Sequence, residues 1–319
     1  MNQTSFEFMR PALPMSTFAA DGDDYADERL TVVDLCCGAG MASLGFRAAG
    51  FEVLGGVDAW DDAVEAFCLN HGNDHDFYRD AGWTKVEDAV EACQRGDWRV
   101  DVVLTGPPCQ DDSRANQGAD KGRGAVKAPA LEAARALNPT WIIMEMVSMS
   151  YVDWCKAQGA RQLLKLRDCD LGGYTTRERW FAIWGPRDLV VEKQTPRGWG
   201  EALGVDDPAA LLATEANSKA KRWRLAKGPS EPAGACVGGD RRHIIRLGTG
   251  EEIRLGPQDE AALSGFPRLQ LQRVEDISDS EGTKVWVQGA QNERDANTMV
   301  GNGWPKSFGL TLGRAIRRS

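Results

Sequence analysis

The chain has 319 residues, of which 42% are hydrophobic and 27% are charged, and its formal net charge is −9. This length allows one large domain with a smaller appendage. The negative charge argues against a protein that coats nucleic acid indiscriminately, because phosphate contacts need clustered Lys and Arg. No segment approaches the roughly 20 apolar residues of a membrane span, and Met1 to Ala20 lack a charged segment followed by an apolar run. We therefore expect a cytoplasmic protein of a bacterium or a phage-infected host.

The cysteines and histidines do not form a metal-binding pattern. The eight cysteines include no Cys-x-x-Cys pair, and no histidines stand at zinc-ligand spacing from them. His71 and His75 are four residues apart, but Gly72, Asn73 and Asp74 between them are typical of a turn rather than a helix. We expect neither a metal site nor a disulfide framework.

From Leu30 onward, short apolar runs alternate with helix-like stretches. Before that point, residues 1–29 are rich in Asp and small side chains and predict a loose acidic leader. The predicted strands are 30–34, 52–57, 100–105, 141–144 and 180–184, and the predicted helices are 42–49, 61–70, 125–136 and 153–166. Buried apolar runs separated by helices are typical of a parallel α/β sheet covered on both faces, which we expect over residues 30–185. Ligands of such sheets bind beyond the carboxyl ends of the strands.

The pattern changes over residues 186–256, which are rich in Gly, Pro and charge and predict a small, irregular lobe. Residues 257–319 are expected to return to the main domain and to close with a helix over 304–316. The segment from Lys219 to Arg246 carries more basic than acidic residues and is either a phosphate-facing patch or a solvated loop. Its basic residues are Lys219, Lys221, Arg222, Arg224, Lys227, Arg241, Arg242 and Arg246.

Two strand ends carry polar residues that suit a cofactor. The first strand runs into the glycine-rich turn from Asp34 to Gly40, and glycines let a backbone turn tightly and approach a ligand closely. Such a turn serves nucleotide cofactors, phosphates or plain packing. The second strand ends at Asp58, an acid that either accepts hydrogen bonds from ribose hydroxyls or caps a helix.

The next two strand ends carry groups that suit catalysis. The third strand runs into Pro107-Pro108-Cys109-Gln110, where the prolines fix the direction of Cys109. A cysteine near basic groups has a lowered pKa and acts as a nucleophile, whereas a buried cysteine only packs. The following strand delivers Glu145, and a carboxylate in a partly dry pocket can hold a proton near neutral pH.

These segments, in this order, resemble the motifs of DNA (cytosine-5)-methyltransferases. They are Asp34 to Gly40, Gly106 to Gln110, Glu145-Met146-Val147, Arg177-Glu178-Arg179, Leu263 to Pro267 and Val300 to Pro305. The resemblance extends from about Leu30 to Arg318. It implies a Rossmann-like, class I S-adenosylmethionine-dependent methyltransferase fold with a small target-recognition lobe, acting as a monomer.

The resemblance also implies a reaction, which is methyl transfer from S-adenosylmethionine to C5 of cytosine in DNA with S-adenosylhomocysteine as product. Cys109 would add to C6 of a cytosine flipped out of the duplex, while Glu145 binds the N3 and N4 edge of the base. Arg177 and Arg179 would position the base or its phosphates, although a solvent-facing strand edge is the alternative reading. The implied cofactor-binding residues are Asp34, Cys36, Gly38, Ala39, Gly40, Asp58, Ala59, Asp80, Pro107 and Asn302.

Three positions depart from the family pattern. Cys36 stands where the family has Phe, Met146 where it has Asn, and Thr175 where it has Gln. These departures leave room for an unusual substrate, an unusual transferred group or a weakened enzyme. Three other interpretations also stay open, namely the same chemistry on RNA or a free nucleotide, a decayed DNA-binding protein, and a dinucleotide-binding oxidoreductase that the glycine turn suggests. The basic stretch favours a polymer, and an oxidoreductase leaves the Pro-Pro-Cys-Gln segment unexplained.

Overall fold

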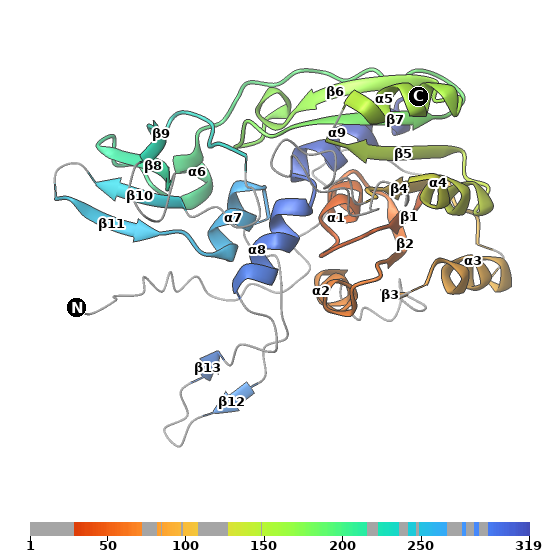
Figure 1. The fold of residues 1–319 in the computed structure, drawn as a ribbon, viewed down its shortest axis with the longest axis horizontal. Coiled ribbons are helices and arrows are strands. Elements are labelled where there is room, and N and C mark those ends of the chain that lie inside the picture. Colours follow the sequence, from red (N-terminus) through yellow and green to blue (C-terminus); the bar gives the residue numbers. More distant parts are fainter. Residues whose placement is uncertain are drawn as a thin grey trace.

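A computed structural model of the protein describes residues 29–71, 82–83, 85–96, 98–107, 127–147, 149–215, 223–235, 242–246, 249–266, 276–278, 284–286 and 293–319. A seven-stranded sheet in the order β3-β2-β1-β4-β5-β7-β6 forms the centre of the main domain (Figure 1). Its strands are β1 (Thr31–Leu35), β2 (Glu52–Val57), β3 (Gly82–Trp83), β4 (Val102–Thr105), β5 (Trp141–Met146), β6 (Gln162–Arg167) and β7 (Glu178–Trp184).

The strand directions confirm the predicted sheet and add one antiparallel strand. β1 pairs in parallel with both β2 and β4, β2 with β3, and β4 with β5. β7 lies antiparallel between β5 and β6. The carboxyl ends of β1, β2, β4 and β5 therefore meet at one edge of the sheet, which is where such folds bind ligands.

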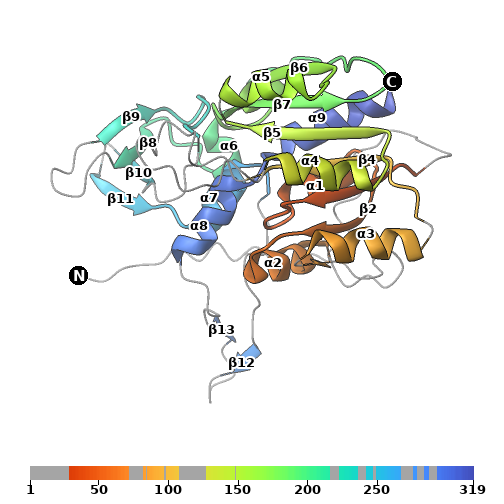
Figure 2. The ribbon, with the colours of Figure 1, turned by 45° about the vertical axis from the view of Figure 1, so that its right-hand side comes forward.

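Helices cover both faces of the sheet, as Figure 2 shows. They are α1 (Met41–Ala48), α2 (Asp61–His71), α3 (Val86–Arg95), α4 (Lys127–Ala136), α5 (Met149–Ala157) and α9 (Lys306–Arg317). Successive strand residues point to opposite faces, so Val32 packs in the same core cluster as Phe46 of α1 and Phe308 of α9, whereas Val33 packs in the cluster with Leu131 of α4. Among the described residues, no helix has the length and apolar character needed to cross a membrane.

The segment predicted to be irregular contains a regular antiparallel sheet in the order β11-β10-β8-β9. Its elements are β8 (Ala210–Glu215), β9 (Trp223–Lys227), β10 (Arg242–Arg246) and β11 (Glu251–Arg254), and the short helix α6 (Trp199–Leu203) precedes them. Trp199, Leu212 and Ile244 are buried together with Leu263 of the next helix. The sequence did not reveal the central pairing of this sheet, because 26 residues separate β8 from β10 and no local turn marks a pairing over that distance.

A buried ion pair joins this lobe to the main domain. Arg242 of β10 is 2% exposed and donates from Nε to Oε1 of Glu260 at 2.6 Å, and a second hydrogen bond joins its Nη2 to Oε2. Its Nη1 donates to the carbonyl of Gly234 at 2.8 Å. The prediction that Arg242 faces phosphates is therefore wrong, because a buried Glu260 requires a buried cation beside it.

Residues 257–319 complete the fold. They form α7 (Pro257–Leu263), the short strands β12 (Asp276–Ser278) and β13 (Lys284–Trp286), α8 (Glu293–Asn302) and α9. Within the described part of the chain, β12 and β13 pair only with each other. α9 lies on the central sheet beside α1 (Figure 1).

One predicted helix is wrong in its second half. The helix expected over 153–166 ends at Ala157, and Gly159 adopts a φ of 81° just beyond it, a conformation that stops helices. Gln162–Arg167 then forms the edge strand β6, paired with β7. Leu, Lys and Arg favour helices in isolation, but pairing with β7 overrides that weak preference.

The crossing of α1 and α9 depends on two glycines at the point of contact. A Cβ atom on Gly45 would lie 2.8 Å from the Cα of Gly309, and a Cβ atom on Gly309 would lie 2.7 Å from the Ala42 carbonyl oxygen. The neighbouring atoms belong to backbone, so they cannot move aside as a flexible side chain can. This contact fixes α9 against the helix that follows the glycine-rich turn.

We expect Gly309→Leu to lower the free energy of unfolding by about 1–3 kcal/mol, because it forces the two helix backbones apart. Thr311→Leu is the matched control, since it adds the same side chain to a half-buried position on the same helix. Chemical denaturation of both variants checks the prediction. Equal losses in the two variants would contradict a role for the close crossing.

Candidate active site

The turn after β1 is built from residues in the left-handed conformation. Gly38 and Gly40 have φ values of 53° and 80°, and Cys36 between them and the strand has a φ of 67°. That conformation costs a residue with a Cβ atom roughly 1 kcal/mol. The Gly40 amide donates to the Cys37 carbonyl at 2.9 Å, which closes the turn directly before α1.

Asp58 ties this turn to the end of β2. Its Oδ2 accepts a hydrogen bond from the Gly38 amide at 2.9 Å, and its Oδ1 accepts one from the Trp60 amide at 3.0 Å. Ala59, the other residue predicted here, is exposed beside it. The two predicted strand ends are thus brought together, and Asp58 has a structural contact besides its predicted contact with a ribose.

Asp34 is a buried carboxyl group at the same edge. It is 2% exposed, and its Oδ2 has no hydrogen-bond partner among the described residues. Burial raises its pKa to about 7, hydrogen bonds from Ser43 oppose that rise, and the nearby charge of Asp58 adds to it. A carboxylate in this environment favours a cationic ligand.

The last two residues of α2 contact the turn from the opposite side. Asn70 Nδ2 donates to the Ala39 carbonyl at 2.9 Å, and His71 Nε2 lies 3.1 Å from Ser43 Oγ. Sequence reasoning considered His71 only as a metal ligand and did not single out Asn70. The sequence signal for this contact was an Asn-His pair at the end of the second helix after the glycine-rich turn. His75 lies outside the described residues, and those residues contain no group of three or more side chains that could hold a metal ion.

At the ends of β4 and β5, a carboxylate and a guanidinium form an ion pair. Glu145 is 6% exposed, and its Oε1 lies 2.6 Å from Nε of Arg179 on β7. A Cβ atom on Gly106 would lie 3.8 Å from Glu145 Oε2 and 3.7 Å from Trp304 Nε1. Pro107 follows at the end of this strand, whereas Cys109 and Asp80 lie outside the described residues.

Arg177, which the sequence predicts to position the base or its phosphates, is buried against the end of α8. It is 4% exposed and donates from Nη1 to the Gly301 carbonyl of α8 at 2.5 Å. The alternative of a solvent-facing strand edge is therefore wrong for Arg177. Its guanidinium joins the start of β7 to the end of α8, where Asn302 is exposed.

A buried carboxylate holds the segment that precedes Arg177. Asp168 is 1% exposed, and its Oδ2 accepts hydrogen bonds from the amide and hydroxyl of Thr175 at 2.8 and 2.6 Å. Its Oδ1 accepts a hydrogen bond from Ser307 Oγ at the start of α9. The Asp168 amide donates to the Arg177 carbonyl at 2.9 Å. Thr175, where the family pattern has Gln, is thus an anchoring residue.

These groups together suit a cationic nucleotide cofactor. The unpartnered Oδ2 of Asp34 offers a buried negative group, and a Cβ atom on Gly38 would have no neighbour within 4 Å. The turn therefore leaves space beside the backbone where a ligand can approach. The residues present fit S-adenosylmethionine, whose sulfonium and ammonium groups are cations.

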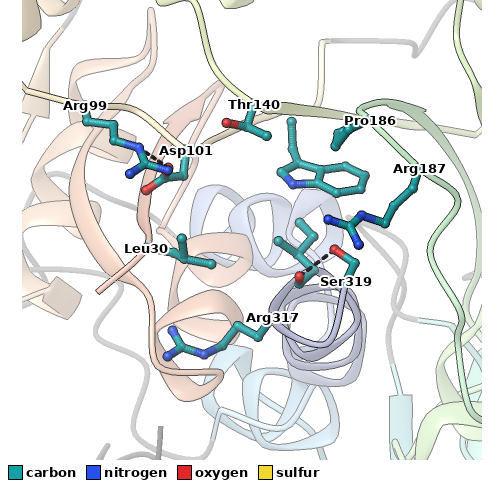
Figure 3. Close-up of a pocket in the computed structure, with 10 residues that line it drawn as sticks. Leu30, Arg99, Asp101, Thr140, Pro186, Arg187, Arg317 and Ser319 are labelled. Carbon is teal, nitrogen blue, oxygen red and sulfur yellow. Dashed lines mark hydrogen bonds and ion pairs between the residues drawn. The ribbon is translucent and has the colours of Figure 1, made fainter. Parts of the chain in front are cut away.

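A separate cavity of about 400 Å³ lies at the opposite edge of the sheet, where β1, β4 and β5 begin (Figure 3). Leu30, Asp101 and Trp141 line it at the starts of these three strands. Arg99 and Asp101 form an ion pair at 2.7 Å on its wall. None of the predicted site residues lines this cavity, so we do not assign the chemistry to it.

Comparison with known proteins identifies a family to which this chain is similar. The family model for C-5 cytosine-specific DNA methylases matches residues 30–150. The type II methyltransferase M.HgiGI of Herpetosiphon aurantiacus is 31% identical over 119 residues, which are 37% of this chain and 90% of that protein. M.NgoPII of Neisseria gonorrhoeae is 30% identical over 186 residues, and this match covers only 52% of its length.

Solved structures share the fold across most of the chain. The crystal structure of the S. pombe Dnmt2 methyltransferase matches with a TM-score of 0.60 at 14% identity and covers 91% of this chain and 99% of that one. The Entamoeba histolytica methyltransferase EhMeth matches with a TM-score of 0.54 at 10% identity, over 90% and 97% of the two chains. The predicted methyltransferase fold is confirmed, and the chain belongs to the C-5 cytosine-specific DNA methylase family.

Proposed function

We propose that the protein transfers a methyl group from S-adenosylmethionine to C5 of cytosine in duplex DNA. The observation that supports the proposal beyond family membership is the Glu145–Arg179 ion pair. This pair lies beside Gly106, at the end of the strand that leads to Cys109. A carboxylate oriented by a guanidinium, next to a chain that continues into a cysteine, supplies the two groups that addition to cytosine requires.

Cys109 acts as the nucleophile in this proposal. Its thiolate forms a bond to C6 of a cytosine flipped out of the duplex, and the electron pair of the C5–C6 double bond moves to C5, where it is shared through C4 with N3. Glu145 binds the N3 and N4 edge through the carboxyl oxygen that faces Gly106, and a proton held between Glu145 and N3 offsets the negative charge that develops there. Arg179 holds the other oxygen and fixes the direction of the carboxylate.

The activated C5 carbon then accepts the methyl group. When bound, S-adenosylmethionine supplies this group as an electrophile. Loss of the C5 proton to a base restores the double bond and breaks the Cys109–C6 bond, so the thiolate returns to its starting state. Arg177 does not contact the base in this scheme. It positions the strand that carries Arg179, because it holds the Gly301 carbonyl.

The turn from Asp34 to Gly40 would hold the cofactor, with Asp34 facing one of its cationic groups. Asp58, Ala59 and Asn302 would be neighbours of the bound cofactor in this proposal. The lobe between β7 and α7 would contact the DNA, and its orientation would be set by the Arg242–Glu260 pair. We expect a monomer to carry out the whole reaction.

The proposal is tested with methyl-labelled S-adenosylmethionine and mixed-sequence duplex DNA, with 5-fluorocytosine replacing cytosine in a parallel sample. Fluorine cannot leave as a proton does, so the enzyme should remain bound to the base as a denaturation-resistant adduct. RNA and deoxycytidine monophosphate are assayed beside the DNA. Labelled 5-methylcytosine in DNA supports the proposal, whereas label only in RNA or in the nucleotide would assign the same chemistry to a different substrate.

Cys109→Ala should abolish both the adduct and the label, because no other group can form the bond to C6. Cys68→Ala is the matched control, since Cys68 is a half-buried thiol on α2. It should retain both signals. Denaturing gel electrophoresis with the labelled DNA measures the adduct, and an adduct that persists in Cys109→Ala would contradict the assignment of the nucleophile.

Asp34→Asn should stabilise the protein in a pH-dependent way while weakening cofactor binding. The pKa of Asp34 is raised from 3.8 to about 7, so the folded state binds a proton that the unfolded state loses. The stability of the natural protein should therefore fall as pH rises from about 4 to 7, by up to about 4 kcal/mol in total, while the Asn variant escapes this loss.

Denaturant unfolding of both proteins between pH 5 and pH 8.5 checks this prediction. The difference in free energy of unfolding should grow with pH up to about 7 and then level off. A difference that stays constant across this range would show that Asp34 does not titrate in the folded protein.

A further inference from the structure

Three buried polar side chains connect the end of α2 to the turn after β1. Asn70 is 6% exposed, and Ser43 and His71 have no exposed surface. Together they contact the carbonyl groups of Ala39 and Gly40. We propose that Ser43, Asn70 and His71 form a turn latch that positions the Asp34–Gly40 turn for binding of S-adenosylmethionine, an inference that rests on the proposed function.

The contacts of the turn latch point to a hydrogen-bond donor at His71 Nε2. Ser43 Oγ lies 3.1 Å from the Gly40 carbonyl oxygen and 3.1 Å from His71 Nε2. His71 Nε2 also lies 3.4 Å from the Gly40 carbonyl oxygen. Because a carbonyl oxygen only accepts hydrogen bonds, a proton on Nε2 serves both the Gly40 contact and the Ser43 contact.

His71 stays neutral in this arrangement. Burial lowers its pKa to about 3, and the nearby Arg47 charge lowers it further. The ring stacks on Phe67 with centroids 4.2 Å apart. The donor at Nε2 is thus fixed in orientation and unaffected by pH in the physiological range, so the turn latch keeps one geometry.

A serine, a histidine and an aspartate are also the residue types of a hydrolytic triad, and they occur here as Ser43, His71 and Asp34. Their burial excludes nucleophilic catalysis by Ser43. A nucleophilic serine must reach a substrate carbonyl, whereas Ser43 and His71 are fully covered. A Cβ atom on Gly40 would lie only 2.6 Å from His71 Nε2, which shows how closely the turn is packed against the ring. The three side chains therefore act on the turn itself.

Fixing these two carbonyls constrains the part of the chain that would meet the cofactor. A peptide group is planar, so holding the Ala39 and Gly40 oxygens also sets the orientation of the following amides. Asn70 Nδ2 donates to the Ala66 carbonyl as well, at 2.8 Å, which anchors the turn latch to its own helix. Asp58 holds the turn from the other side through Gly38. The turn is thus held in place before any ligand arrives, which reduces the entropy cost of binding.

The test measures S-adenosylmethionine binding by calorimetry and unfolding by denaturant on the full chain, together with methylation kinetics. Asn70→Ala and His71→Leu should each raise the Kd and the KM for S-adenosylmethionine about 10-fold, the effect of losing one buried hydrogen bond, while kcat at saturating cofactor changes less than twofold. His71→Gln, whose amide can donate to Ser43, should recover most of the affinity. Cys68→Ala on the same helix is the control and should leave the Kd unchanged.

The outcomes separate this inference from the proposed function. If the natural protein binds no S-adenosylmethionine, the proposed function fails and the turn latch fails with it. If it binds the cofactor and the variants bind equally well while losing stability, the proposed function stands and the turn latch is overturned. Ser43→Ala, which removes the same contacts without adding volume, decides the question if His71→Leu does not fold. Its Kd should also rise about 10-fold, and an unchanged Kd would overturn the inference.

Discussion

The burial of Asp34 is the constraint on which the candidate site depends. A carboxyl group with 2% exposure costs free energy when it ionises, and its pKa of about 7 expresses that cost. The surrounding structure offsets only part of it through Ser43, and leaves Oδ2 without a partner. A protein selected for stability alone would place an apolar residue here. A bound cationic ligand would offset the cost of ionising Asp34, so the buried carboxyl group lowers the stability of the free protein and favours ligand binding.

Buried polar contacts link the small lobe to the segment that precedes β7. Arg242 holds the Gly234 carbonyl, and Ala233, the residue before Gly234, exchanges backbone hydrogen bonds with the Tyr174–Thr176 segment at 2.7 and 2.8 Å. Thr175 in that segment is anchored by Asp168, two residues before Arg177. The lobe and the start of β7 are therefore held by contacts with the same segment.

The sequence predicted the central sheet well because its strands are short apolar runs that local composition reveals. It predicted less where a contact joins distant segments. Arg242 looked like one member of a basic patch, and only the fold shows that Glu260 neutralises it. Leu163 and Leu166 looked helical until pairing with β7 determined a strand. His71 was considered only as a metal ligand beside a turn, whereas the fold places its ring 3.1 Å from the hydroxyl of Ser43, 28 residues earlier. The order of the motifs identified the family, but side-chain partners required the three-dimensional arrangement.

The three departures from the family pattern are accommodated by their neighbours. Met146 is fully buried, and the Cys155 thiol lies 3.4 Å from its sulfur, so its side chain is packed in the core. Thr175 donates both of its polar hydrogens to Asp168. Burial raises the pKa of Cys36 to about 12, so its thiol stays neutral and adds no negative charge beside Asp34 and Asp58. Each change is matched by local packing or hydrogen bonding, and none of them removes a group that the proposed transfer to cytosine uses.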